Sequence, residues 1–120
     1  MKTDNVILVK SKCFAVCCIK LYQYLCKEKS EYVISKQLLR SGTSIGANVK
    51  EAIRGQSLAD FGAKMNIALK EASETEYWIE LLIESDYLTL LESEKILGVC
   101  REIIKLLTSI VKTTFSKQKK

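Results

Sequence analysis

The chain lacks some of the residue types and motifs that usually carry chemistry in proteins, and this excludes most kinds of catalytic site. The sequence contains no histidine. It therefore cannot form a Ser-His-Asp or Cys-His nucleophile, a Glu-x-x-His di-iron site, a histidine-dependent ribonuclease or a zinc hydrolase of the usual type. Glycine-rich phosphate loops are also absent. Only carboxylate-based chemistry remains, so the sequence predicts a protein that is not an enzyme and that binds no cofactor.

The cysteines are the other reactive group, and the chain contains five of them: Cys13, Cys17, Cys18, Cys26 and Cys100. Their odd number and the absence of any Cys-x-x-Cys pair argue against a disulfide framework. Cys13 and Cys17 stand one helical turn apart and could share a metal ion, but no histidine is available to complete the site. We interpret all five as reduced thiols, with Cys18 and Cys100 as small core residues, and expect no metal site.

The overall composition is that of a single helical domain. Apolar residues make up 48% of the 120 residues, which is enough for one core, and the chain contains no proline and only five glycines. Straight side chains such as Leu, Lys and Glu dominate, and they lose little rotamer freedom in a helix. The apolar run at residues 6–9 is too short for a secretory signal or a membrane span. We therefore expect a cytoplasmic protein with no membrane association.

Four segments show the apolar spacing that is typical of helices, and breaks of a few polar residues separate them. Ser30 is the expected N-cap of the second helix, and Gly55 is expected to end it in the left-handed conformation. Pairs with the spacing of capping boxes precede the third and fourth helices: Ser57 with Asp60, and Thr89 with Glu92. The first helix is predicted to begin between residues 4 and 11 and to end near residue 27, and the others to span residues 31–54, 58–84 and 90–115.

Loops this short force consecutive helices to run antiparallel. We therefore predict an all-α fold, an antiparallel up-down-up-down four-helix bundle over residues 1–115, followed by a basic, disordered tail at residues 116–120. Heptad-spaced seams mark the core sides of the third and fourth helices: Leu58, Phe61, Met65, Ala68, Ala72, Thr75, Ile79 and Leu82, and then Ile96, Cys100, Ile103, Leu107, Ile110 and Thr114.

The second helix has three faces when its residues are projected at about 100° per residue. Its core face holds Ile34, Leu38, Ser41, Ile45, Val49 and Ala52. Another face, with Leu39, Gly42, Gly46 and Ile53, predicts the close approach of a neighbouring helix, in the same subunit or in another one. Opposite the core lies a basic stripe, which we define as Lys36, Arg40, Lys50 and Arg54.

The basic stripe permits two interpretations. It is either an ordinary solvated helix face or a surface that contacts the phosphate backbone of a nucleic acid. The net charge of +5 and the lysines near the carboxyl terminus favour the second interpretation.

The third helix carries an apolar face opposite its core seam, formed by Ala63, Ile67, Tyr77, Trp78 and Leu81. A monomer rarely exposes its only tryptophan together with other large apolar residues, so we interpret this face as an oligomer interface. The alternative is a set of scattered apolar residues, which are common on protein surfaces.

Projection also places Glu76 in the core stripe of the third helix, where a carboxylate needs a hydrogen-bonding partner. The candidates are Asn48, Ser41 and Ser44 on the second helix, or an arginine on a flanking helix. We expect a structural hydrogen bond rather than catalysis, with Glu76 and Asn48 as buried polar residues.

Several segments resemble one known protein family. Residues 35–52, SKQLLRSGTSIGANVKEA, resemble the signature of a four-helix-bundle family whose members were first noticed as open reading frames within intervening sequences of bacterial 23S rRNA genes. Asp60-Phe61, residues 67–72 and residues 74–82 are similar to the third helix of that family. Phe14-Ala15 and Leu21-Tyr22 are similar to its first helix.

The resemblance implies a non-enzymatic bundle that assembles as a ring-shaped homopentamer. It also implies kinship with the accessory protein of diversity-generating retroelements, which works with a reverse transcriptase and RNA through a basic surface, although this chain is less basic. We therefore expect a homo-oligomeric scaffold that binds structured RNA or a reverse transcriptase–RNA complex. The alternative is an oligomeric protein–protein adaptor with no nucleic-acid role.

Overall fold

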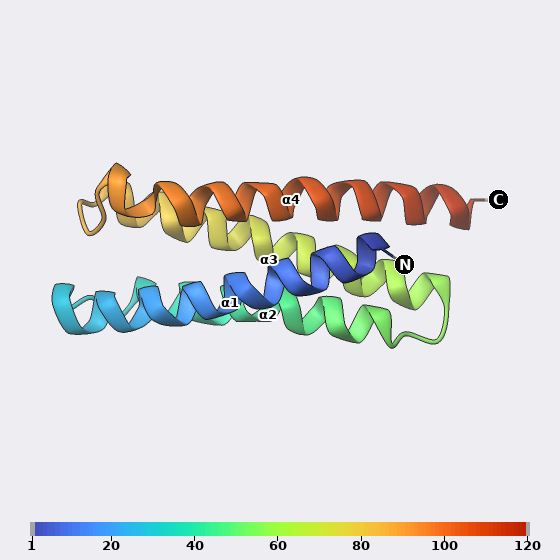
Figure 1. Cartoon of the computed structure of the whole chain (residues 1–120), viewed down its shortest axis with the longest axis horizontal. Coiled ribbons are helices and arrows are strands. Elements are labelled where there is room, and N and C mark those ends of the chain that lie inside the picture. Colours follow the sequence, from blue (N-terminus) through green and yellow to red (C-terminus); the bar gives the residue numbers. More distant parts are fainter. Residues whose placement is uncertain (1, 120) are drawn as a thin grey trace.

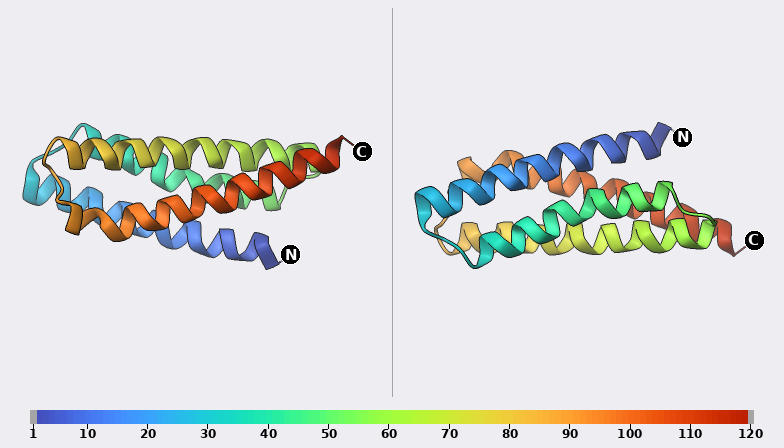
Figure 2. Two further views of the ribbon diagram at one scale, coloured as in Figure 1. Left: turned by 90° about the horizontal axis from the view of Figure 1, so that it is seen from above. Right: turned by 90° about the horizontal axis from the view of Figure 1, so that it is seen from below.

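A computed structural model of the chain contains four long helices that lie side by side (Figure 1). It describes the backbone of residues 2–119 and the side chains of residues 6–119. The helices are α1 (Lys2–Lys29), α2 (Ile34–Ile53), α3 (Leu58–Glu84) and α4 (Leu90–Gln118). Consecutive helices run antiparallel, and both chain termini lie at the same end of a body of 50 × 22 × 20 Å (Figures 1 and 2). The predicted all-α, up-down-up-down bundle is confirmed. In the described part of the chain, no helix is long and apolar enough to cross a membrane.

The predicted apolar seams form the core. On α3 the seam residues from Met65 to Leu82 are buried, and on α4 those from Cys100 to Thr114 are buried. Leu58 is an exception, because it lies in the first turn of α3 and is exposed. A hydrogen bond of 2.8 Å joins the buried hydroxyls of Ser41 on α2 and Thr75 on α3, so neither polar group is left unsatisfied.

The glycine-containing face of α2 packs against α1 of the same chain. A Cβ at Gly42 would lie 2.4 Å from Sγ and 2.9 Å from Cβ of Cys18, and a Cβ at Gly46 would lie 3.3 Å from Oγ of Ser11. Cys18 and Ser11 are completely buried at this contact. The neighbouring helix that the sequence predicted is therefore α1, and the two glycines let the backbones approach closely.

The start of α2 differs from the prediction. Ser30 does not cap this helix; it has a left-handed φ of 53° and ends α1, where the Glu31 amide donates to the Leu25 carbonyl at 3.0 Å. Helix α2 begins at Ile34 rather than Glu31. The buried carboxylate of Glu31 caps it instead, because it accepts hydrogen bonds from the amides of Val33, Ile34 and Ser35 at 3.1, 2.9 and 2.6 Å.

The N-caps of α3 and α4 agree with the prediction. Ser57 Oγ accepts the Asp60 amide at 3.0 Å. Thr89 and Glu92 form a complete capping box, with hydrogen bonds of 3.0 and 2.8 Å between each side chain and the other residue's amide. Gly55 follows α2 as predicted, but φ is not positive at this residue.

Both ends of the bundle extend further than predicted. Helix α1 begins at Lys2, and α4 continues past Phe115 to Gln118, so the first three residues of the predicted tail are helical. Gly62 on α3 lets α4 approach closely near this end, because a Cβ there would lie 2.9 Å from Cγ2 of Thr114. Lys120, at the end of the predicted tail, lies outside the described residues.

Two glycine substitutions test the close contact between α1 and α2. Gly42→Ala should lower the free energy of unfolding by about 1–3 kcal/mol, because its methyl group overlaps the buried Cys18 side chain. Gly98→Ala is the matched control on α4, where no atom lies within 4 Å of the added Cβ, and it should raise stability by about 0.5–1 kcal/mol. Urea unfolding at one protein concentration measures both. Equal effects of the two substitutions would contradict the packing described above.

The cap of α2 should make stability depend on pH. Burial alone would raise the pKa of Glu31, but the hydrogen bonds from the amides of Ile34, Ser35 and Val33 outweigh it and hold the pKa below its usual value. A carboxylate with a lowered folded pKa stabilises the protein above its unfolded pKa of about 4.3, and this contribution is lost as the pH falls through the folded pKa.

Glu31→Gln should therefore lower the free energy of unfolding by about 1–2 kcal/mol at pH 7. The difference from wild type should shrink as the pH falls below about 4.3. Glu94→Gln, at an exposed position of α4, is the control and should change stability little. Urea unfolding between pH 3 and 7 on the three proteins tests this. If the free energy of unfolding of Glu31→Gln stayed below that of wild type by the same amount over this range, the carboxylate charge would not be what caps α2.

Candidate nucleic-acid interface

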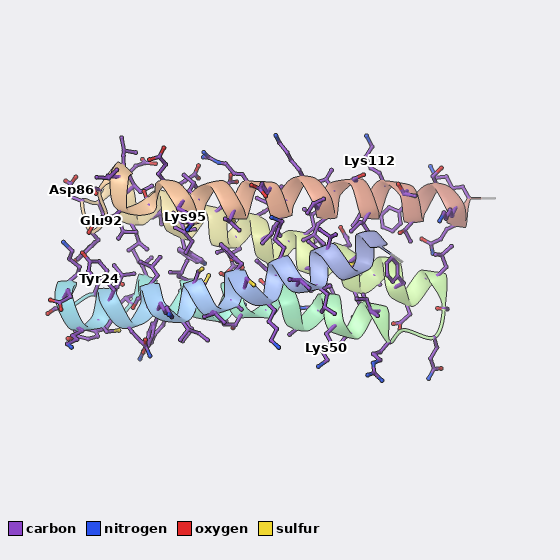
Figure 3. The ribbon with its side chains drawn as sticks, in the orientation of Figure 1. Tyr24, Lys50, Asp86, Glu92, Lys95 and Lys112 are labelled. Atoms are coloured by element: carbon purple, nitrogen blue, oxygen red, sulfur yellow. The ribbon has the colours of Figure 1, made fainter. Side chains whose placement is uncertain are left out.

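The basic stripe lies on the outer side of α2. Lys36, Lys50 and Arg54 are exposed, and Lys50 points away from the bundle (Figure 3). The helix rises about 27 Å between Lys36 and Arg54, at about 1.5 Å per residue. Among the side chains of residues 6–119, no carboxylate forms an ion pair with any of these three cations. Three of the four predicted stripe residues therefore present their charge to solvent.

Arg40, the fourth stripe residue, is held by α3 instead. Its guanidinium donates to the carboxylate of Glu74 and, at 3.1 Å, to that of Glu71. The hydrogen bond with Glu74 is the main reason that the pKa of Arg40 is raised. Glu74 also accepts the indole N–H of Trp78 at 3.0 Å. Arg40 therefore contributes less free positive charge to the stripe than its position on α2 suggests.

A lysine on α1 extends the basic surface beyond α2. Lys12 and Lys50 line a groove of about 330 Å³ between α1 and α2, together with Leu8, Ala15, Thr43, Gly46 and Ala47. Lys12 was not among the residues predicted from the sequence. It follows Ser11, which packs on Gly46, and this contact is what brings the lysine to the edge of α2. The candidate interface consists of Lys12, Lys36, Lys50 and Arg54.

Helix α3 is acidic, and its glutamates bind the arginines of both neighbouring helices. Six acidic residues and two lysines lie in α3, whereas six lysines and two acidic residues lie in α1. On the side opposite Arg40, Arg101 of α4 donates to Glu76 at 2.9 Å and to Glu80 at 3.2 Å. The acidic charge thus gathers around α3, away from the candidate interface on α1 and α2.

The expectation that Glu76 and Asn48 are buried polar residues is wrong. Glu76 is partly exposed at the edge between α3 and α4, and its partner is Arg101, one of the flanking arginines considered from the sequence. Asn48 is half-buried, and its amide donates to the carbonyl and the hydroxyl of Ser44 at 2.9 and 3.2 Å within α2. The two residues do not contact each other, because they lie on different edges of the bundle.

The predicted apolar face of α3 is only partly exposed. Ala63, Ile67 and Tyr77 are exposed, whereas Trp78 and Leu81 are half-buried. Trp78 packs against the core and makes an edge-on contact with Tyr77, with ring centroids 5.1 Å apart. The exposed part of this face is therefore smaller than predicted, and Tyr77 is its largest side chain.

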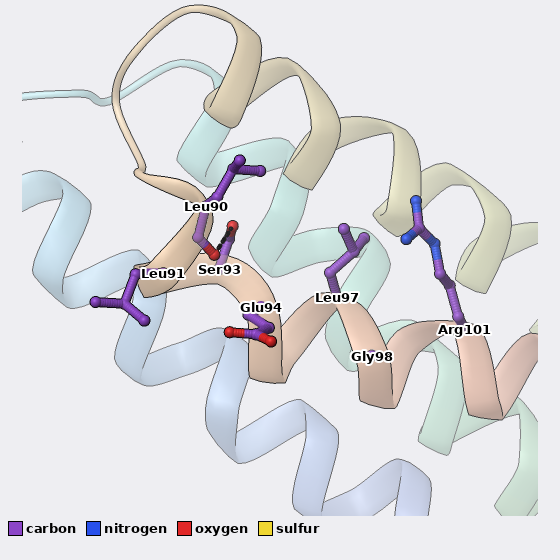
Figure 4. A pocket seen from close by; sticks show the side chains of 7 residues that line it. All are labelled: Leu90, Leu91, Ser93, Glu94, Leu97, Gly98 and Arg101. Atoms are coloured by element: carbon purple, nitrogen blue, oxygen red, sulfur yellow. Dashed lines mark hydrogen bonds between the residues drawn. The ribbon is translucent and has the colours of Figure 1, made fainter.

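Two further apolar surfaces involve α4, and the sequence analysis missed both. A groove of about 660 Å³ separates α1 from α4 and is lined mainly by Val6, Val9, Cys13, Phe14, Cys17 and Val99. A smaller hollow of about 460 Å³ lies on the first half of α4, between the exposed Leu90 and Leu91 and the paired Arg101 (Figure 4). The residues of the larger groove come from two helices, whose relative placement cannot be read from one periodic pattern.

The cysteines separate into buried and exposed groups. Cys18 and Cys100 are completely buried, as predicted, and burial raises the pKa of Cys100 to about 12. Burial likewise raises the pKa of Cys18 far above its usual range. Cys13 and Cys17 are exposed on α1. No group of three or more cysteine and carboxylate side chains is placed to hold a metal ion among the described residues.

Comparisons with known proteins point to one family. A family model described as 23S rRNA-intervening sequence protein matches residues 3–109. A crystal structure of a protein of unknown function from the S23 ribosomal protein family of Bacteroides thetaiotaomicron is 57% identical in sequence. The match covers 92% of this chain and 98% of that chain, with a TM-score of 0.89. A search among curated proteins finds no match.

Proposed function

The chain belongs to the 23S rRNA-intervening sequence protein family, and from this premise we propose that it is a non-enzymatic, homo-oligomeric scaffold that binds structured RNA. The observation that carries the proposal is the set of exposed cations on α1 and α2, Lys12, Lys36, Lys50 and Arg54, with which no described carboxylate forms an ion pair. The RNA can be bound alone or within a complex with a protein such as a reverse transcriptase.

The physical basis is the release of counterions from phosphates. Each cation that contacts a phosphate displaces a condensed counterion, which favours binding without regard to base sequence. One chain offers only a few such cations, so its own affinity is expected to be low. A homo-oligomer, a pentamer by analogy with the family resemblance, would repeat the interface and engage several phosphates at once.

A role without catalysis is consistent with the reactive groups of the chain. The two buried thiols have raised pKa values, which makes them poor nucleophiles at neutral pH. The glutamates of α3 that lie near one another are occupied by Arg40 and Arg101. Unpaired thiols also suit a reducing compartment, and we place the scaffold in the cytoplasm.

A protein–protein adaptor with no nucleic-acid role is the second candidate. The pairing of Arg40 with two glutamates favours it, because this pairing weakens the basic stripe. The apolar groove between α1 and α4 also favours it. The two candidates differ in one measurable property, the dependence of RNA affinity on salt.

A salt titration tests the proposal. Lys50→Gln/Arg54→Gln removes two charges from the candidate interface, and Lys105→Gln/Lys112→Gln, on the exposed side of α4, is the matched control. The slope of log affinity against log salt should become shallower by about 0.7–0.9 for each phosphate contact that the first variant loses. The control should keep the wild-type slope. Fluorescence anisotropy with a structured RNA, at salt concentrations from 50 to 200 mM, measures all three proteins.

Two results would contradict RNA binding through this interface. One is an absence of binding by wild type at low salt, and the other is the same slope for both variants. Either result would favour the adaptor function. Circular dichroism checks that both variants keep their helices, which is expected because none of the four residues is buried.

A further inference from the structure

Helix α1 carries an apolar stripe that no other described part of the chain covers. Val6, Val9, Cys13 and Val16 follow one another at intervals of three and four residues, and we call them the α1 stripe. Val9 is 63% exposed and Val6 50%. Such spacing is typical of a helix face that packs against another helix. Val6, Val9 and Cys13 also line the groove between α1 and α4. Helix α4 crosses α1 at an angle in Figure 2.

Helix α3 carries a second apolar stripe, which two charged residues interrupt. Ala63, Ile67, Tyr77 and the half-buried Leu81 lie at heptad positions along its outer side, and Lys70 and Glu74 occupy the two heptad positions between Ile67 and Tyr77. We call the four apolar residues the α3 stripe. Tyr77 is 53% exposed and Ile67 42%. A large exposed aromatic side chain is the type of residue that anchors protein interfaces by entering an apolar groove.

The charges around the two stripes are opposite. Lys95 and Lys10, which is paired with Glu102 at 2.8 Å, line the groove beside the α1 stripe, and α1 as a whole has six lysines and two acidic residues. Glu74 lies within the α3 stripe and is paired with Arg40, and Glu84 lies beyond the end of the stripe, in a helix with six acidic residues and two lysines. Two α1 stripes packed against each other would bring lysines together, and two α3 stripes would bring glutamates together. Only the pairing of unlike stripes is favoured by both the apolar contacts and the charges.

We propose that the α3 stripe of one chain packs against the α1 stripe of a second copy, with Tyr77 entering the groove between α1 and α4. This inference rests on the homo-oligomer of the proposed function and assigns its contact surfaces. The contact is head-to-tail, so each chain uses one surface toward each of two neighbours, and repetition closes a ring or continues as a filament. The outer side of α2 takes no part in it and stays open to RNA.

Two variants, each with one altered stripe, test the head-to-tail contact. Val9→Glu/Val16→Glu alters the α1 stripe, and Ile67→Lys/Tyr77→Lys alters the α3 stripe; all four residues are exposed, so the fold should survive. Each variant alone should be monomeric, with the 13.6 kDa mass of one chain. An equimolar mixture should form a species of twice that mass, because each variant supplies the stripe that the other lacks. Size-exclusion chromatography with light scattering measures the masses, and circular dichroism checks the helices.

The thiols of α1 give a second, independent readout. Cys13 and Cys17 are exposed in the single chain and should be covered in the assembly. They should react slowly with a thiol reagent in wild type and at least tenfold faster in Ile67→Lys/Tyr77→Lys, although that variant leaves α1 unchanged. The buried Cys18 and Cys100 provide the internal control.

The possible outcomes separate this inference from the function it rests on. Two results would overturn the head-to-tail contact and leave the scaffold function standing. One is an oligomeric wild type whose assembly persists in Val9→Glu/Val16→Glu, and the other is a pair of variants that fail to associate when mixed. A wild type that is monomeric at every concentration would overturn both. Assembly of the mixture together with protection of Cys13 and Cys17 supports the contact.

Discussion

The close packing of α2 against α1 is the constraint on which the rest of the structure depends. Gly42 and Gly46 leave no room for side chains beside Cys18 and Ser11, and on the other side of α2 the Ser41 hydroxyl is bonded to Thr75. These contacts fix the rotation of α2 about its own axis. As a result Lys36, Lys50 and Arg54 cannot turn toward the core. Exposing the cations of the candidate interface therefore costs no packing energy.

Helix α3 determines where the positive charge of the bundle is available. Its glutamates pair with Arg40 on one side and with Arg101 on the other. Exposed ion pairs of this kind contribute little to stability. Their larger effect is on the distribution of charge, because they neutralise Arg40 and Arg101, whereas the exposed lysines of the candidate interface, like Lys105 and Lys112 on α4, form no ion pair among the described residues. The same division between a basic α1 and an acidic α3 makes unlike surfaces of two copies complementary.

Much of the fold could be predicted from the sequence, because long helices without proline bury every third or fourth residue, as the seam from Met65 to Leu82 does. The family could also be identified from residues 35–52, and the match over residues 3–109 confirms it. The projection placed Glu76 in the core stripe because it points in the same direction as the apolar residues Leu69 and Ile83. Both of these are only half-buried, at the edge of the core, so that direction is not a core position. The pairing of Arg40 with α3 depends on the alignment of two helices along their axes, and the projection of a single helix does not contain that information.

We propose that RNA binds the side of the bundle formed by α1 and α2. Acetylation of lysines with and without a structured RNA, followed by mass spectrometry, tests it most directly, because every exposed lysine reports on its own surroundings. We expect Lys12, Lys36 and Lys50 to lose reactivity when RNA is bound, and Lys105 and Lys112 on the outer side of α4 to keep theirs. Protection of Lys105 and Lys112 without protection of the other three, or equal reactivity of all five with and without RNA, would contradict it.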